Sequence, residues 1–358
     1  MARRTMVKHV FLSFLFFLGQ IALGWAQSDS TTSLTDEVVG TTTSSNLSYL
    51  PNALQFANTG GKLPEDLLHT KSAVFVDMID APGTNWKELA HEVHPAFDEL
   101  GIDAVAYYSW RDANAGPDAT RKLAKELNQR YIENIIYLGY HQPSKEYVLL
   151  IAPFDTEDPF VNRQQGAFQL VAGTPQTLQR QLSNVVRRSG IEKQNFLVID
   201  VPEFFIGAGN VVRGNRAEGF AQDLKLDKLA VPRFGNEQDS ALQRIMQPYP
   251  YEYALVDPER AEDDLRQDGY QYILLNLHTQ EANIKNMLGY RDDSSQESTS
   301  SANKTTDTSA GPSVYKFYVK HIYTGDVYVG DTWDASPSWQ TALTKYLRNM
   351  RDDMSIGQ

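Results

Sequence analysis

The chain has 358 residues, of which 41% are hydrophobic and 22% are charged, and it contains no cysteine. Ordinary globular composition at this length predicts about two domains. The missing cysteines exclude disulfides, thiolate metal sites, cysteine nucleophiles and a lipid-modified cysteine. The formal net charge is −12. Because a phosphate backbone would be repelled by this charge, we expect no nucleic-acid binding.

Residues 1–26 are typical of a cleaved signal peptide. Arg3, Arg4 and Lys8 give a basic start, an apolar run follows, and small residues precede a predicted cleavage after Ala26. The apolar run is shorter than the roughly 20 residues that span a bilayer, which disfavours a membrane anchor. The paired arginines leave open export by the twin-arginine route. We expect an exported protein, periplasmic or secreted, with no transmembrane segment after cleavage.

Two segments are rich in Ser and Thr and poor in large apolar residues. Such composition cannot bury enough surface to offset ordering, so we expect a flexible leader over residues 27–68 and a disordered insertion over residues 291–312. Asn46 and Asn303 head glycosylation sequons, which matter only in a host that modifies Asn. Asp29-Ser30-Thr31 resembles the short O-glycosylation signal of Bacteroidota.

The first folded part alternates strand and helix patterns. Its apolar residues recur at spacings of two or of three to four. Asn85 is placed to cap a helix, and Gly190 to end one. The predicted elements are, in chain order, strand 72–79, helix 86–100, strand 103–110, helix 117–132, strands 134–142, 145–154 and 166–173, helix 174–190 and strand 195–205.

The second folded part repeats this order. Its predicted elements are strand 228–235, helix 239–249, strand 251–257, helix 258–269, strands 270–279, 314–324 and 326–333, and helix 336–353. We therefore predict an α/β fold of two tandem β-α-β-α-β-β-β-α modules with mixed sheets, arisen by internal duplication. Coincidence is the alternative, since α/β chains alternate in any case. The predicted boundaries are module 1 at 69–203, an inter-module loop at 204–225 and module 2 at 226–358.

The stretch KLAVPRFG, residues 228–235, resembles the first strand of the α/β module in the curli-secretion-channel and TolB N-terminal families. Each copy resembles that module loosely, at the level of the fold. The resemblance implies an interaction module of the bacterial cell envelope. Those families add a lipidated cysteine or a β-propeller. This chain shows neither, so channel and propeller functions are not implied.

Motifs for catalysis and metal binding are weak. His91 and His94 form H-x-x-H and not H-E-x-x-H, and their helical positions disfavour convergence on one ion. His141 and His278 end equivalent predicted strands, which is typical of hydrogen bonding at a turn. We expect no metal and no cofactor.

Nucleophile, nucleotide and acid-pair motifs are equally weak. Ser313-Val314-Tyr315-Lys316 fits S-x-x-K but lies on a predicted strand. Residues 207–212 only begin like a dinucleotide fingerprint. The acid pairs are local in sequence, and Asp334 before Ser336-Pro337 indicates a helix start. A hydrolase with paired carboxylates would need acids that meet from distant loops.

Ligand loops in α/β folds follow the carboxyl ends of strands. In module 1 this rule selects Asp80 and the loop that contains Trp110, Arg111, Asp112 and Asn114, which mixes aromatic, cationic, acidic and amide groups. The alternative is a solvated loop whose Trp packs on the edge of the module.

Two further surfaces are candidates. Arg213 and Arg216 lie in the Gly-containing inter-module loop and could grip an anionic group or a partner. In the last hairpin Lys316, Tyr318 and Lys320 share one strand face, which we expect to be a docking face or an exposed edge.

These features favour a non-catalytic binding or adaptor protein of the cell envelope, acting through loops and sheet edges on a protein partner. One alternative is a two-lobed receptor for a small solute, closing near residues 204–220. The second alternative is the hydrolase.

Overall fold

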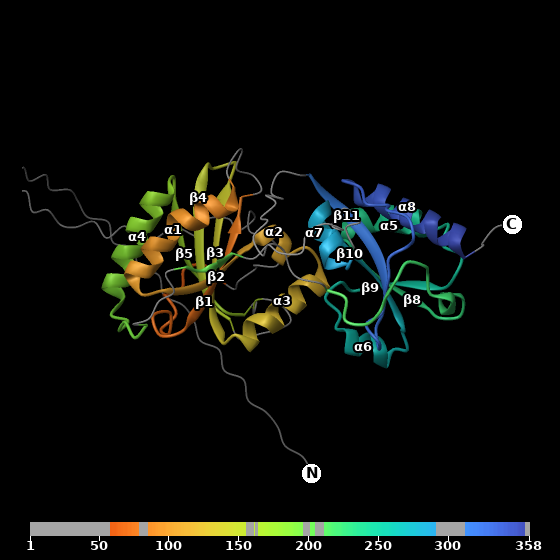
Figure 1. Ribbon diagram of the computed structural model, residues 1–358, viewed down its shortest axis with the longest axis horizontal. Helices are drawn as coiled ribbons and strands as arrows, with labels where there is room; N and C mark the ends of the chain where they lie inside the picture. Colours follow the sequence, from red (N-terminus) through yellow and green to blue (C-terminus); the bar gives the residue numbers. More distant parts are fainter. Residues whose placement is uncertain are drawn as a thin grey trace, which may run out of the picture. The chain divides into compact units, whose positions relative to one another are not determined.

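The computed structural model describes residues 58–78, 85–154, 161, 164–195, 201–204, 211–290 and 312–354. Figure 1 shows their helices and strands. The predicted signal peptide, most of the predicted leader and residues 291–311 of the predicted insertion lie outside the described residues. Among the described residues the chain forms two mixed six-stranded sheets and eight α-helices, which confirms the predicted α/β class.

The first sheet has the strand order β5-β4-β3-β1-β2-β6. Its strands are β1 (Lys71–Asp77), β2 (Asp103–Ser109), β3 (Ile132–His141), β4 (Glu146–Pro153), β5 (Phe168–Ala172) and β6 (Glu203–Phe204). β1 pairs in parallel with both β2 and β3, and β2 pairs in parallel with β6. β3, β4 and β5 form antiparallel pairs, as the short turn between β3 and β4 requires.

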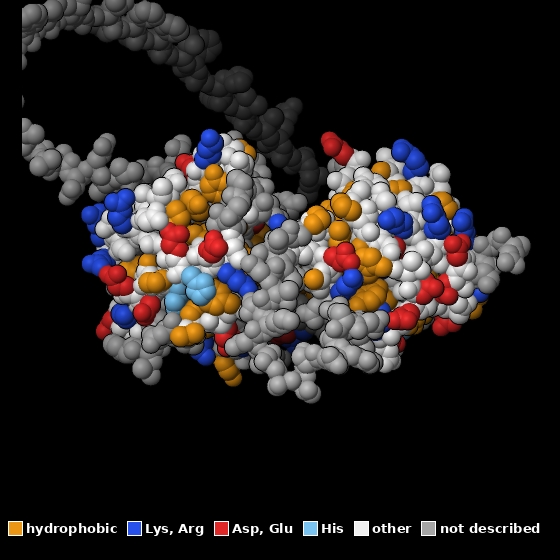
Figure 2. Space-filling view, turned by 45° about the horizontal axis from the view of Figure 1, so that its top comes forward, with side chains coloured by type: hydrophobic (Ala, Val, Ile, Leu, Met, Phe, Trp, Pro, Cys, Tyr) orange, Lys and Arg blue, Asp and Glu red, His pale blue; other side chains and the backbone are white. Residues whose placement is uncertain are grey.

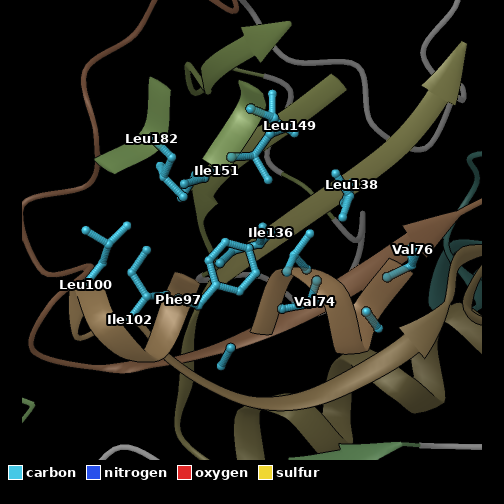
Figure 3. Close-up of a cluster of buried hydrophobic side chains, with 14 of the residues drawn as sticks. Val74, Val76, Phe97, Leu100, Ile102, Ile136, Leu138, Leu149, Ile151 and Leu182 are labelled. Carbon is cyan, nitrogen blue, oxygen red and sulfur yellow. The ribbon is translucent and has the colours of Figure 1, made fainter. Parts of the chain in front are cut away.

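Four helices pack on this sheet: α1 (Trp86–Leu100), α2 (Trp110–Ala113), α3 (Pro117–Gln129) and α4 (Pro175–Ser189). The Asn85 side chain caps α1 by accepting from the Lys87 N–H, and Thr174 caps α4 in the same way through Thr177. α1 and α4 bury their apolar stripes on one face, and α2 and α3 cover the other (Figure 1). Figure 3 shows Phe97 of α1 and Leu182 of α4 in the core between these two helices and the sheet.

The second sheet has the strand order β7-β12-β11-β10-β8-β9. Its strands are β7 (Arg216–Ala217), β8 (Leu229–Pro232), β9 (Tyr253–Val256), β10 (Tyr272–Gln280), β11 (Ser313–His321) and β12 (Val327–Tyr328). Its helices are α5 (Asn236–Met246), α6 (Glu262–Gln267), α7 (Glu281–Met287) and α8 (Trp339–Asp353), with a 3-10 turn η3 (Gln222–Lys225) before β8.

Five strands of each sheet share one topology. β5-β4-β3-β1-β2 and β12-β11-β10-β8-β9 have the same order and the same parallel and antiparallel pairings. The sixth strands differ, because β6 adds beside β2 whereas β7 adds beside β12. The helix order also matches the predicted repeat apart from the short α2 and α7. Common origin by duplication stays a prediction.

The prediction of an exposed docking face on β11 is wrong. β11 lies between β10 and β12, so both of its edges are paired, and buried side chains pack on both of its faces. Lys316, Tyr318 and Lys320 are at most 2% exposed. The alternation of the strand correctly separated the two faces, but α3 and α7 pack on the polar one. Its charges are therefore buried and paired.

The core in Figure 3 sets a stability test with a matched control. Leu182 is 1% exposed, whereas Leu226 is 91% exposed. We expect Leu182→Ala to lower the free energy of unfolding by about 2–5 kcal/mol, because it removes buried contacts and leaves a cavity. Leu226→Ala should change it by less than about 0.5 kcal/mol. Urea denaturation measures both, and equal effects would contradict the burial of α4.

Candidate functional site

The strongest candidate site lies at the carboxyl ends of β8 and β9. The chain leaves β8 for α5, which packs on one face of the sheet, and leaves β9 for α6, which packs on the other. β8 pairs with β9 on one side and with β10 on the other, so the strand order reverses at β8. In open α/β sheets such a switch point leaves a crevice outside the strand ends, where ligands bind. We call the pocket found here the switch-point pocket.

The switch-point pocket has a volume of about 180 Å³. Four parts of the chain line it: the loop after β8, the loop that leads from β9 into α6, the middle of β10 with Phe317 of β11, and the start of α3. The lining residues are Pro117, Arg121, Val231, Pro232, Arg233, Phe234, Asp257, Pro258, Arg260, Glu262, Ile273, Leu274, Leu275, Asn276 and Phe317.

The pocket exists because β8 stops pairing early. β10 pairs with β8 only through Tyr272↔Leu229 and Ile273↔Ala230. The next bond of a parallel ladder would need an N–H on Pro232, which proline lacks. In the first sheet the equivalent ladder between β1 and β3 continues through seven pairs. Pro232 therefore opens the edge of β10 at a place where the first sheet is closed.

The turn between α2 and α3 closes the far end of this opening. The backbone N–H of His278 donates to the Ala115 carbonyl at 2.7 Å, so the edge of β10 is covered again there. Gly116 packs so closely that a Cβ on it would clash with the backbone oxygen of Asn276. Leu274, Leu275 and Asn276 thus line the pocket between β8 on one side and the α2–α3 turn on the other.

Asp239 holds the loop after β8. Its Oδ1 accepts from the backbone N–H groups of Phe234 and Gly235 at 3.1 and 3.2 Å, and its Oδ2 accepts from Arg233 Nη1 at 3.1 Å. Gly235 has φ +115°, a backbone conformation that side chains rarely adopt. The two N–H groups that directly precede α5 are therefore bonded to a carboxylate of the chain itself.

A network of buried charges forms the wall of the pocket at α3 and α6. Lys320 Nζ donates to Asp118 Oδ1 at 2.6 Å and to Glu262 Oε1 at 2.8 Å. Arg121 Nη1 donates to the same two carboxylates at 3.1 and 2.9 Å. Tyr318 OH donates to Asp118 Oδ2 at 3.0 Å. Elements of both sheets therefore share one ion network.

This network fixes the charge of Glu262. Burial is the largest single effect and opposes its ionisation, but the charge and hydrogen bond of Lys320 together with the charges of Arg121 and Arg213 outweigh it, so the pKa of Glu262 is lowered. Arg260, also at the pocket, contacts Asp268. Asp257 accepts from the backbone N–H of Glu259 at 2.9 Å. The pocket is thus lined by three arginines, at positions 121, 233 and 260, and by two carboxylates that already accept hydrogen bonds from the chain.

Aromatic rings form the opposite wall. Phe234 stacks on Trp339 of α8, with centroids 4.6 Å apart, and meets Phe317 edge-on at 6.3 Å. Phe317 is 1% exposed and so is fixed by the core. A ligand group here would contact rigid apolar rings on one side and guanidinium groups on the other.

The predicted loop of module 1 is a short buried helix, α2. Trp110 is buried edge-on against Phe75 and Tyr137. This agrees with the alternative that the tryptophan packs on the module. Asp112 is buried and accepts from Thr279 Oγ1 at 2.5 Å and from Asn283 Nδ2 at 2.8 Å, and burial raises the pKa of Asp112.

The remaining predicted residues are scattered. Arg111 is half-buried and Asn114 is exposed. Arg216 lies 4.1 Å from the Tyr290 ring centre and pairs with Glu218. Arg213 is exposed, and its charge helps to lower the pKa of Glu262, which lines the pocket. Among the predicted residues, Arg213 is therefore connected electrostatically to the pocket. Asp80 lies outside the described residues.

The histidines are dispersed. His94 is buried with Nδ1 3.1 Å from Tyr107 OH, whereas His91 is exposed and packs on Phe204. His141 Nδ1 lies 2.9 Å from Ser144 Oγ in the turn after β3. His278 stacks on Tyr315 with centroids 3.8 Å apart. Within the described ranges no three His, Asp or Glu side chains gather as a metal site would require.

The interpretation of Asp334 as a helix-start residue is wrong. Ser338 caps α8, and Asp334 instead accepts from Lys316 Nζ at 2.7 Å and from Asn349 Nδ2 at 3.1 Å. Burial lowers the pKa of Lys316 and raises that of Asp334, whereas their mutual pairing, with the hydrogen bond from Asn349 to Asp334, acts against both shifts. Sequence spacing could not show that β11 would deliver a lysine there.

Sequence reasoning missed Arg121, Arg233, Phe234 and Arg260. A signal for two of them was present, because Arg233 follows the strand KLAVP and Arg260 follows ALVDPE. Ligand loops in α/β folds follow the carboxyl ends of strands, and this rule selects both arginines when it is applied to the second module as well as the first. Arg121 carried no such signal, since its place at the pocket depends on how α3 packs.

The chain matches no protein-family model, no curated protein and no solved structure. The resemblance to the curli-secretion-channel and TolB N-terminal module therefore stays a prediction. Figure 2 shows acidic and basic side chains interspersed over the face that it displays.

The close approach at Gly116 gives a second test. We expect Gly116→Ala to lower the free energy of unfolding by about 1–3 kcal/mol, because the new methyl group meets backbone and cannot be accommodated by a rotamer change. Gly173→Ala is the matched control, since a Cβ there has open space. Chemical denaturation compares the two, and an equally mild effect would contradict the packing of the α2–α3 turn on β10.

Glu262 gives a pH-dependent test. Because its folded-state pKa is lowered, its contribution to stability is present above the unfolded value of about 4.3 and is lost as pH falls through the folded value. We expect Glu262→Gln to be less stable than the wild type by about 1.5–3 kcal/mol at pH 7. The difference should shrink below about pH 4.3.

Denaturation curves from pH 7 to pH 3 measure this difference. The exposed Glu65→Gln serves as the control, for which we expect little change at any pH. A Glu262→Gln penalty that is independent of pH would contradict the ion network.

Proposed function

We propose that the protein is a non-catalytic binding protein of the bacterial cell envelope, in which a protein partner inserts an anchoring group into the switch-point pocket. The observation that carries this proposal is the opening of the β10 edge beyond Pro232, at the strand ends where α/β folds bind ligands. Loops and a sheet edge together form the site, as an adaptor requires.

The size of the pocket supports an anchor. Pockets that enclose a drug-sized molecule measure roughly 300–1,000 Å³, whereas a cavity of roughly 150 Å³ holds a benzene ring. At about 180 Å³ the switch-point pocket suits one side chain or a group of similar size. Most of the affinity would then come from a few fixed contacts, as at a hot spot of a protein interface.

The state of the acids supports binding over hydrolysis. Asp257 and Glu262 both line the pocket, so it does contain two carboxylates. A glycoside hydrolase needs one of its acids to keep a proton near neutral pH. The pKa of Glu262 is instead lowered, and Lys320 and Arg121 occupy the carboxylate. These contacts suit an electrostatic wall better than a proton donor.

A small-solute receptor is the second candidate. It is favoured by one observation, that Pro117 and Arg121 from the first module line a pocket made by loops of the second. A receptor of this kind usually closes around its ligand by a hinge. The junction here is held by Asp118 with Lys320 and Tyr318, all at most 3% exposed, which favours a fixed site.

Location in the cell envelope rests on the sequence of residues 1–26. Among the helices that the structure describes, none combines the length and apolar character needed to cross a bilayer. Export and a partner in the envelope are predicted from the sequence, and both belong to the proposal.

Site-specific photo-cross-linking in the native envelope tests this function. A photoreactive residue at Pro258, which lines the pocket and is exposed, should capture one defined protein that mass spectrometry can identify. The same residue at Lys345, exposed on α8, is the control and should not capture that protein. Capture from both positions, or from neither, would reject the pocket as the binding site.

A further inference from the structure

We propose that the anchoring group is the carboxyl-terminal end of an extended peptide whose last side chain is apolar. This inference rests on the proposed function and gives the chemistry of the bound group. Three features of the switch-point pocket support it: an open strand edge, a group of arginines and a rigid apolar wall.

The open strand edge fits an extended peptide. Backbone groups along a strand alternate between its two edges with a period of two. His278 N–H points to the edge covered by Ala115, so the N–H of Asn276 and the carbonyl of Leu274 share that edge. Pro232 has no N–H to give the Leu274 carbonyl. The Leu274 carbonyl therefore faces the opening without a donor from Pro232, and the Asn276 N–H lies one ladder step farther along the same edge. A short extended chain is the natural complement of such an edge.

The arginines fit a carboxylate. Arg233 and Arg260 flank the opening, with side chains 47% and 31% exposed, and each pairs with one carboxylate of the chain. A guanidinium carries five N–H donors, so such a pair leaves donors that can bind a second carboxylate. Guanidinium groups match carboxylates in a planar, often bidentate geometry. Asn276 N–H would add a backbone donor beside them.

The same geometry disfavours a phosphate. A phosphate at this position of an α/β fold uses the backbone N–H groups at the start of the helix. Here Asp239 holds the N–H groups of Phe234 and Gly235, which directly precede α5, so this part of the loop cannot bind a phosphate. The chain is also strongly acidic overall, which penalises a multiply charged ligand more than a single carboxylate.

The apolar wall fits the last side chain of the peptide. Phe317 and Phe234 are held by the core and by Trp339, and Pro232 and Pro258 lie at the rim. These surfaces keep their shape without a ligand, so little ordering is needed on binding. The volume of about 180 Å³ leaves room for one such side chain beside its carboxylate.

Fluorescence anisotropy with the purified full chain tests the inference. The probe is an amino-terminally labelled tetrapeptide that ends in leucine, prepared with a free carboxylate and with a carboxamide. We expect the free acid to bind at least about tenfold more tightly, as the loss of charge-assisted hydrogen bonds implies. Equal affinities of the two forms would overturn the inference.

Variants locate the contact. Arg233→Gln and Arg260→Gln should each lower the affinity for the free-acid peptide by at least about tenfold, because each removes a contact to its carboxylate. The affinity for the carboxamide peptide should not change. Arg244→Gln, exposed on α5 away from the pocket, is the matched control and should change neither. Circular dichroism confirms that each variant is folded. Insensitivity of the free acid to both variants would overturn the inference.

Two outcomes separate this inference from the proposed function. If free leucine binds as tightly as the free-acid peptide, the inference of a peptide ligand is wrong and the solute receptor is favoured. If no peptide binds but Pro258 still captures a protein partner, the inference is wrong and the binding function stands. If Pro258 captures nothing, the proposed function itself fails.

Discussion

The structure depends on the contact of the α2–α3 turn with β10 and β11. Asp118 lies in the first turn of α3 and is 3% exposed, and Lys320, Tyr318 and Arg121 all donate hydrogen bonds to it. An isolated buried charge costs several kcal/mol, and pairing with good hydrogen bonds offsets that cost. Asp112 makes a second buried contact through Thr279 and Asn283. Removing any of these donors would take a hydrogen bond from a buried carboxylate, so the packing of the turn is strongly specified.

The switch-point pocket is a consequence of that contact. β8 ends its ladder with Pro232, and the turn resumes the cover of β10 at His278. Between them the strand edge stays open, and Arg121 is placed at its border by the same ion network that holds α3. Stability and binding therefore share residues here. A change that loosens the network would also displace one wall of the pocket.

The two sheets show how a shared topology can give one site and not two. Their five common strands have the same order and direction. In the first sheet β1 and β3 pair along seven residues, so the corresponding edge is closed, and α2 buries Trp110 and Asp112 beside it. In the second sheet one proline ends the ladder early. Fold class alone would not have distinguished these two cases.

The sequence by itself determined the alternation of strands and helices, their order and the α/β class, because apolar periodicity and capping residues such as Asn85 and Thr174 are local signals. It also carried a signal for Arg233 and Arg260, which follow strands, but the strand-end rule, applied to the first module alone, missed them. Only the tertiary structure decided that Lys316 and Lys320 are buried, that Trp110 and Asp112 pack in a junction, and that Arg121 borders a pocket. These outcomes depend on which distant surfaces meet, and a buried lysine paired with an aspartate has the same local pattern as an exposed one.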